Sequence, residues 1–136
     1  MRHFFIALAA VALASQSSFA QTPNPIDCSE AVTTVEMNYC AERDYERADE
    51  KLNAIYQRVV TAIRDSDGQP PYDPRNWESE LRNAQRSWIA FRDAECKGLV
   101  PMEWGGGTGT AVAVLSCMTE LTKARTKAFQ DRYVNR

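Results

Sequence analysis

The sequence predicts an all-α protein, a small antiparallel three-helix bundle closed by two disulfides. Three runs of apolar residues recur every three to four positions, which is the period of an amphipathic helix. Clusters rich in glycine, proline and aspartate separate these runs, and no stretch alternates apolar and polar residues for the length of a strand. The four cysteines form an even set. We therefore expect one helical domain over residues 21–136, without internal repeats.

The first twenty residues have the features of a secretory signal peptide. A short basic start containing Arg2 precedes the apolar residues 4–14, and Ser18-Phe19-Ala20 ends in small residues suited to cleavage. The apolar run is too short to span a bilayer, which takes roughly 20 residues. The first cysteine, Cys28, does not lie at the cleavage point, so no lipid anchor is expected. We therefore expect residues 1–20 to be removed and the protein to be periplasmic or secreted.

Composition argues against several function classes. The formal net charge is −2 and becomes more negative when Arg2 leaves with the leader, so no basic surplus indicates nucleic acid or an anionic membrane. The single histidine, His3, also leaves, which removes histidine bases and histidine-ligated metals. The tract Gly105 to Thr110 lacks the Gly-Lys-Ser/Thr continuation of a phosphate loop. We expect no enzyme activity, no cofactor and no metal.

The first helix should begin at Thr33, because Thr33 and Glu36 have the spacing of a capping box. It should run to about Arg64, before a breaker cluster at residues 65–71. Its inward face is predicted to consist of apolar and small residues at helical spacing, namely Met37, Ala41, Tyr45, Ala48, Leu52, Ile55, Tyr56, Val59 and Ile63.

The second helix should start with Asp73 as its cap and Pro74 as its first residue, and Gly98 should end it. Its predicted inward residues are Trp77, Leu81, Ala84, Trp88, Phe91, Arg92 and Cys96. After a loose connection, Thr108 or Thr110 should cap a third helix. The inward residues of that helix are predicted to be Ala111, Val114, Leu115, Met118, Leu121, Arg125, Ala128 and Phe129.

Four cysteines in an exported chain of this size predict two disulfides, although their number permits three pairings. Cys28 lies just before the first helix and Cys40 in its second turn. Cys96 lies at the end of the second helix and Cys117 two turns into the third. This neighbourhood favours the pairs Cys28–Cys40 and Cys96–Cys117.

Arg92 lies in an otherwise apolar stripe, where a charge without a partner is costly. Arg125 has an equivalent place on the third helix, and Asp44 or Asp49 could pair with either arginine. We expect Asp49, Arg92 and Arg125 to form a structural polar network that fixes the register of the three helices. The alternative is a binding or catalytic cluster.

Four acids and an asparagine share one side of the first helix, beside its core face: Glu42, Glu46, Asp49, Glu50 and Asn53. This acidic stripe is either an ordinary solvated face or a docking surface for a basic partner, whose opposite charge would speed association. Trp104 could add an aromatic anchor to such a surface, or cover the end of the bundle.

The order of these features resembles the LprI-type lysozyme-inhibitor family, formerly a domain of unknown function. The matching residues, spread over nearly the whole mature chain, are Asp27-Cys28, Met37-Asn38, Cys40-Ala41, Ala48-Asp49, Leu52-Asn53, Tyr56, Gln85-Arg86, Trp88, Phe91-Arg92-Asp93, Glu95-Cys96, Cys117, Leu121-Thr122 and Arg125. The resemblance implies exported, largely helical bacterial proteins, among which lysozyme inhibition is assigned to a mycobacterial lipoprotein. This chain lacks the lipid-attachment cysteine of that member.

These features are compatible with three functions. The first is non-catalytic binding of a cationic c-type lysozyme, with the acidic stripe and Trp104 as contacts. The second is an envelope interaction or immunity-type module for another protein partner, without lysozyme activity. The third, an enzyme acting on cell-wall or small-molecule substrates, is disfavoured by the missing histidine and the absence of a recognisable acid/base set.

Overall fold

The structure, a computed structural model, describes residues 26–135. Its helices are α1 (Thr34–Arg64), α2 (Pro74–Ala94), α3 (Val100–Glu103) and α4 (Thr110–Phe129), and π-helical turns follow α2 (Glu95–Leu99) and α4 (Gln130–Val134). No strand occurs in this part of the chain, which confirms the all-α class. The predicted signal peptide, residues 1–20, lies outside the described residues. Among residues 26–135, no helix has the length and apolar character needed to cross a membrane.

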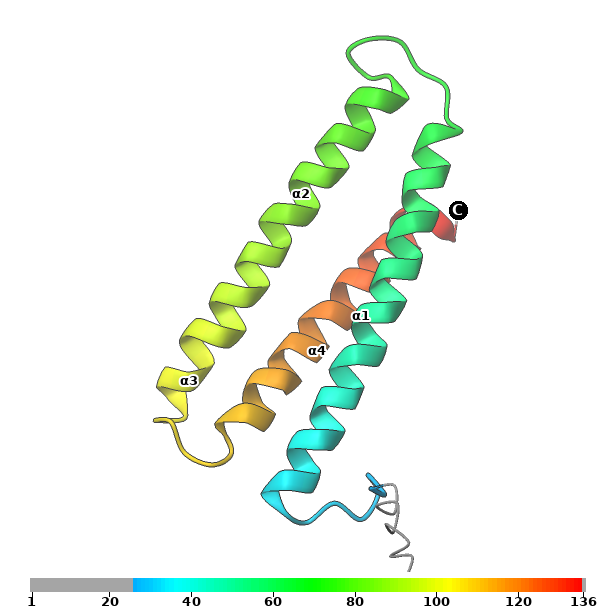
Figure 1. The fold of residues 1–136 in the computed structure, drawn as a ribbon. Helices are drawn as coiled ribbons and strands as arrows, with labels where there is room; N and C mark the ends of the chain where they lie inside the picture. The colour runs from blue at the N-terminus through cyan, green and yellow to red at the C-terminus, as the bar shows by residue number, and fades with distance from the viewer. Residues whose placement is uncertain (1–25, 136) are drawn as a thin grey trace, which may run out of the picture.

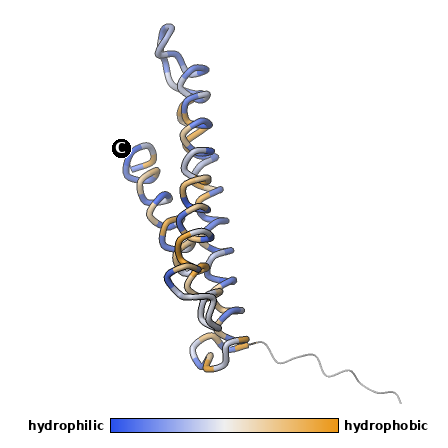
Figure 2. Tube along the Cα trace, turned by 90° about the vertical axis from the view of Figure 1, so that its left-hand side faces the viewer, coloured by the Kyte–Doolittle hydropathy of each residue, from blue (hydrophilic) through white to orange (hydrophobic). Residues whose placement is uncertain are grey.

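The three long helices form an up-down-up bundle (Figure 1). α1 and α2 make a long hairpin, α3 and the following loop reverse the chain at its other end, and α4 returns beside α1 in the same direction. α1 and α4 share the most extensive interface, whereas α2 meets both along a narrower stripe. Figure 2 shows that the loop joining α1 to α2 is largely hydrophilic. The antiparallel three-helix bundle predicted from sequence is confirmed.

The first two of the three predicted helix starts are confirmed, because their signals are local. The Thr33 hydroxyl accepts a hydrogen bond from the Glu36 N–H at 3.2 Å, and the Glu36 carboxylate accepts one from the Thr33 N–H at 2.9 Å. Asp73 caps α2 by accepting from the Asn76 N–H at 3.0 Å, with Pro74 as the first helical residue. Such caps contribute typically about 1 kcal/mol each.

Two predicted boundaries are wrong. Gly98 does not end the second helix, because the chain passes through a π-helical turn in which the Val100 N–H donates to the carbonyl of Glu95. Pro101 follows in the first turn of α3, where its missing N–H breaks no helical hydrogen bond. Neither Thr108 nor Thr110 caps the last helix, since Gly109 occupies the N-cap position and no side chain bonds there.

The end of the bundle near the α1–α2 loop has an apolar core, and we call it the apolar half. Its buried cluster consists of Leu52, Ile55, Val59, Val60, Ile63, Leu81 and Phe129. Tyr56, Trp88, Tyr133 and Val134 pack against this cluster. Burial of such side chains stabilises a fold by about 1.5–3 kcal/mol each, before the entropy of ordering the chain is subtracted.

The opposite end carries both disulfides, and we call it the stapled half. Cys28–Cys40 ties the segment before α1 to that helix, and Cys96–Cys117 joins the π-helical turn after α2 to α4, which confirms the predicted pairing. Three polar residues are buried in this half: Arg92, Thr119 and Thr122. By the chain-entropy argument, each disulfide contributes about 3 kcal/mol.

Several residues predicted to face the core are exposed instead. On α1, Met37 is 40 % exposed, because it lies in the first turn of the helix. On α2, Trp77, Ala84 and Phe91 are exposed, because that helix contacts its neighbours only along a narrow stripe. On α4, the residues that were predicted to face the core but are exposed are Ala111 and Ala128.

On α4 the buried positions between apolar residues are filled by Thr119, Thr122 and Thr126, which the predicted inward face omitted. The hydroxyl of Thr119 donates to the carbonyl of Leu115 at 2.8 Å, and that of Thr126 to the carbonyl of Thr122 at 2.9 Å. A threonine satisfied within its own helix presents its methyl group to the neighbouring helix. It therefore packs as a small apolar residue.

Candidate functional site

The predicted acidic stripe lies on α1 and is open to solvent along most of its length. Glu42, Glu46, Glu50 and Asn53 are exposed, and Asp49 is half-buried. Spacings of three and four residues place them as neighbours on one side of the helix. The stripe is therefore a continuous row of carboxylates rather than a scatter of charges.

Most of the charge on this stripe is not neutralised by neighbouring side chains. Glu46 accepts from Arg43 at 3.0 Å, but both side chains are about half exposed, and such a surface pair contributes at most about 1 kcal/mol. Glu42 and Glu50 have no cationic side chain within 4.0 Å among residues 26–135. These two carboxylates remain available to an incoming cation.

Asp49 differs from the other members because it turns toward the interior. Its Oδ1 lies 3.6 Å from Nη1 of Arg92 on α2, and its Oδ2 accepts a hydrogen bond from the Asn53 amide at 3.0 Å. Asp49 therefore connects the exposed stripe with the buried polar residues of the stapled half.

Arg92 is the centre of that buried cluster and is only 7 % exposed. Its Nε and Nη2 lie 3.0 and 2.9 Å from Oδ1 of Asp93, and Nη1 donates to the Thr122 hydroxyl at 3.5 Å. The guanidinium also lies 5.6 Å from the ring centre of Tyr45 and 5.2 Å from that of Trp88. One side chain of α2 thus contacts both α1 and α4.

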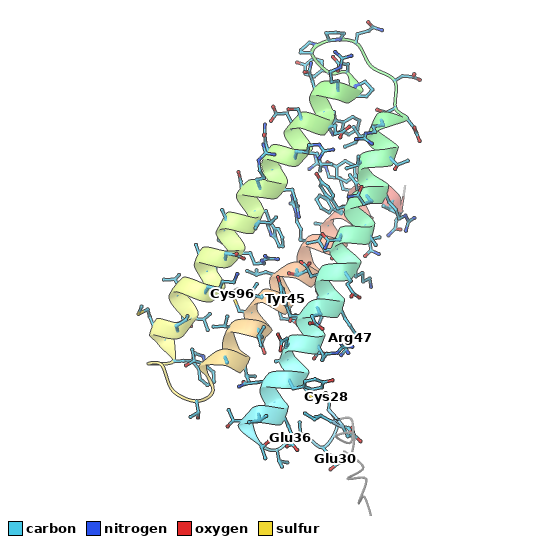
Figure 3. All side chains as sticks on the ribbon, viewed as in Figure 1. Cys28, Glu30, Glu36, Tyr45, Arg47 and Cys96 are labelled. Carbon is cyan, nitrogen blue, oxygen red and sulfur yellow. A yellow bond between two sulfur atoms is a disulfide. The ribbon has the colours of Figure 1, made fainter. Side chains whose placement is uncertain are left out.

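Figure 3 shows Tyr45 on the side of α1 that faces α2, with Arg47 on the other side. Burial raises the pKa of the Tyr45 phenol, although the nearby positive charge of Arg92 opposes this effect. Burial also tends to raise the pKa of the Asp93 carboxyl, but hydrogen bonds from Lys97 and Arg92 and their charges outweigh it and lower that pKa. Asp93 is therefore a stable anion and Tyr45 a neutral ring beside Arg92.

Arg125 was predicted to join this network, but it contacts no carboxylate in it. Its Nε donates to the Gln85 side chain at 3.1 Å, and its guanidinium lies 4.3 Å from the ring centre of Phe129 and 5.7 Å from that of Trp88. Asp44, the other predicted partner, pairs with Arg47 instead. Trp88 lies between the two arginines and is the link between them.

Trp104 lies in the loop after α3 and is 54 % exposed. Its ring packs against Gly109, where an added Cβ would approach the ring to 2.7 Å. No interaction described for residues 26–135 joins Trp104 to the acidic stripe. Tyr39, three residues before Glu42 and 42 % exposed, is an aromatic neighbour of the stripe.

Sequence reasoning missed Tyr45, Asp93, Thr122 and Tyr39 as members of these two sites. The signals for Asp93 were its place next to Arg92 and its spacing of four from Lys97. The signal for Thr122 was its position, since it has the helical spacing of the core residues on α4. Tyr39 shares the side of α1 occupied by Glu42, which a helical projection could have revealed.

The chemistry available in the described part of the chain is that of charged and aromatic contacts. No group of three or more histidine, cysteine or acidic side chains is arranged there to hold a metal ion. All four cysteines are oxidised in disulfides and offer no thiol nucleophile. The acidic stripe presents carboxylates to solvent, and Arg92 on α2 contacts side chains of both α1 and α4.

Comparison with known proteins adds two positive findings. The sequence profile of the family described as lysozyme inhibitor LprI matches residues 27–129. A protein of Rhizobium meliloti (strain 1021), described as uncharacterized, is 37 % identical over 115 residues, which cover 82 % of this chain and 81 % of that protein. No solved structure matches significantly.

Proposed function

The chain belongs to the LprI family of lysozyme inhibitors, and from this premise we propose that it binds a cationic c-type lysozyme without catalysing a reaction. Family membership and the two disulfides indicate a protein that works outside the cytoplasm. The finer proposal is a periplasmic or secreted inhibitor, exported by the leader at residues 1–20.

The observation that carries this proposal is the row of carboxylates on α1. Glu42 and Glu50 are exposed and without an ion-pair partner in the described chain, so their charge is directed to solvent. Opposite charge on a partner steers the encounter and raises the association rate. Tyr39 adds an aromatic ring beside the stripe, and Trp104 is kept as a second proposed contact at the end of the bundle.

The test is lysis of bacterial cell walls by hen lysozyme, with and without the oxidised protein, at low and near-physiological salt. A triple reversal, Glu42→Lys with Glu46→Lys and Glu50→Lys, should weaken inhibition about tenfold or more at low salt and much less at high salt. The melting temperature should change little, because these side chains are exposed.

A matched triple reversal of exposed acids elsewhere has the same effect on net charge: Asp67→Lys, Glu120→Lys and Asp131→Lys. Equal weakening by both triples would show that only net charge matters and would remove the stripe as the docking surface. No inhibition by the unaltered protein at roughly 50 µM would contradict lysozyme binding itself and would favour another envelope protein as partner.

Arg92→Met separates the buried cluster from the docking surface. It removes the cation that pairs with Asp93 and Asp49, so we expect a loss of about 1–3 kcal/mol in unfolding free energy. Inhibition per folded molecule should be unchanged. Selective loss of inhibition at unchanged stability would make Arg92 a contact residue instead.

A further inference from the structure

A groove runs between α2 and the C-terminal part of α4, in the apolar half and apart from the acidic stripe. Its volume is about 280 Å³, close to the lower end of small-ligand pockets. Trp77 and Leu81 line one wall, and Phe129 and Tyr133 line the other. Beside Trp77 it adjoins a second hollow formed by Pro71, Tyr72 and Asn76.

Two arginines bring positive charge into this groove. Arg125 is half-buried, and its guanidinium lies 4.3 Å from the Phe129 ring centre, while that of Arg132 lies 5.3 Å from the Tyr133 ring centre. The carboxylate in the lining, Glu80, is more than 4.0 Å from both guanidinium groups. The lining of the groove therefore combines aromatic rings with two cations and one carboxylate, a net positive charge.

Arg125 differs from Arg92 in what it pairs with. Arg92 has two carboxylates near it, whereas the one hydrogen bond of Arg125 within residues 26–135 goes from Nε to the neutral Gln85 side chain. Burial and the neighbouring charge of Arg132 both lower the pKa of Arg125. Its two terminal nitrogens, which form the fork suited to a carboxylate, have no acceptor in the described chain.

We propose that this groove binds the free C-terminal carboxylate of a short peptide that ends in an apolar residue. The fork of Arg125 receives the carboxylate, and Arg132 adds a second positive charge. The apolar side chain packs against the outer surface of the Trp77–Tyr133 pair, whose ring centres are 6.2 Å apart and which therefore contact each other. The rest of the peptide leaves over the hollow beside Tyr72.

Charge and shape select this occupant. The lining holds two arginines and one carboxylate, Glu80, so its net positive charge favours an anionic ligand. A guanidinium that lies over aromatic rings favours a planar anion such as a carboxylate. The aromatic walls exclude a ligand that is polar throughout, because its groups would lose water without gaining partners. The proposal concerns a different surface from the stripe on α1, so either can fail without the other.

The test is an NMR titration of the oxidised protein that follows the indole N–H of Trp77. The probes are N-acetyl-Ala-Leu, its C-terminal amide, and N-acetyl-Asp-Leu-amide, which carries its carboxylate on a side chain. The free acid should shift the Trp77 signal, with an affinity at least tenfold above both amides. Arg125→Gln should weaken binding of the acid at least tenfold, and Arg58→Gln, the same change at an exposed α1 site outside the groove, should not.

Equal binding of the acid and its amide would overturn the proposal, as would the absence of any Trp77 shift at about 10 mM acid. If N-acetyl-Asp-Leu-amide binds more strongly than the free acid, the groove recognises an acidic side chain rather than a peptide C-terminus, and the proposal is overturned. If Arg125→Gln does not fold, the comparison of acid and amide on the unaltered protein still decides the outcome.

Discussion

The two ends of the bundle are stabilised in different ways. In the apolar half, aliphatic and aromatic side chains of three helices exclude water from a continuous cluster. In the stapled half, a buried arginine, two threonines and two disulfides occupy the corresponding places. The halves also differ in surface chemistry, because the acidic stripe begins in the stapled half and the arginine-lined groove lies in the apolar half.

This difference shows what a small exported helical protein gains from disulfides. α2 meets its neighbours along a narrow stripe, so it cannot bury a wide apolar face. Covalent links restrict the unfolded chain and do not require such a face. The stapled half can therefore carry polar residues in its interior and charged residues on its surface without a large apolar core.

The sharpest way to break the comparison is to open a cavity in the apolar half. Leu52 is 2 % exposed, and Leu52→Ala should lower the unfolding free energy by about 2–5 kcal/mol. Urea denaturation followed by circular dichroism measures this change. Met102→Ala, at a position 81 % exposed, should stay within about 0.5 kcal/mol of the unaltered protein. A small effect at Leu52 would mean that this cluster is not the main core.

The next test removes a staple. Replacing both Cys96 and Cys117 by alanine should cost about 3 kcal/mol, because the bond joins α4 to the turn after α2 across a separation of 21 residues. The same treatment of Cys28 and Cys40 should cost less, since Cys28 is exposed and its bond closes a separation of 12 at the edge of the bundle. Thermal unfolding of the two double variants measures the order, and a reversed order would contradict it.

The smallest expected effect concerns acid. Hydrogen bonds from Arg64 and Arg82 lower the pKa of the Glu78 carboxyl from 4.5 to about 2, the Arg64 contacts being 2.6 and 2.7 Å. Because the folded pKa is depressed, the stabilisation is complete above about pH 4.5 and disappears as the pH falls toward 2. Glu78→Gln should therefore flatten the loss of stability between those pH values, as read from urea midpoints at low salt.

Asp93→Asn provides the matching measurement in the stapled half, where Lys97 and Arg92 also lower a carboxyl pKa against the effect of burial. Asp93→Asn should also reduce the loss of unfolding free energy at acid pH, but by less than Glu78→Gln does. Equal acid limbs in the unaltered protein and both variants would show that neither carboxylate links stability to pH.

Local signals in the sequence predicted the parts of the fold that depend on neighbouring residues. The capping box of Thr33 and Glu36 and the Asp73-Pro74 start are decided within one helical turn, and both were predicted correctly. The disulfide pairing followed from the order of elements. The end of α2 could not be predicted from local signals. The π-helical turn that continues past Gly98 contains Cys96, and its disulfide to Cys117 on α4 is a tertiary contact.

Features that depend on how helices meet were predicted less well. Phe91 has the helical spacing typical of a core position but is 55 % exposed. The orientation of α2 against α1 and α4 decides which of its residues are covered, and the sequence of α2 alone does not give that orientation. Thr122 was passed over although it is fully buried, since residue type alone does not reveal how a threonine hydroxyl is satisfied. The contact of Asp49 with Arg92 was anticipated, whereas the separation of Arg125 from any carboxylate depends on tertiary geometry.

The two disulfides join the first cysteine to the second and the third to the fourth. When a chain leaves a translocation channel with its amino end first, Cys28 emerges before Cys40. At that stage Cys28 is the one free thiol with which Cys40 can pair. Cys96 then meets Cys117 after the first pair has been consumed. We therefore expect oxidation in order of emergence to yield the native bonds directly, so that an oxidant of thiols suffices and no disulfide isomerase is needed.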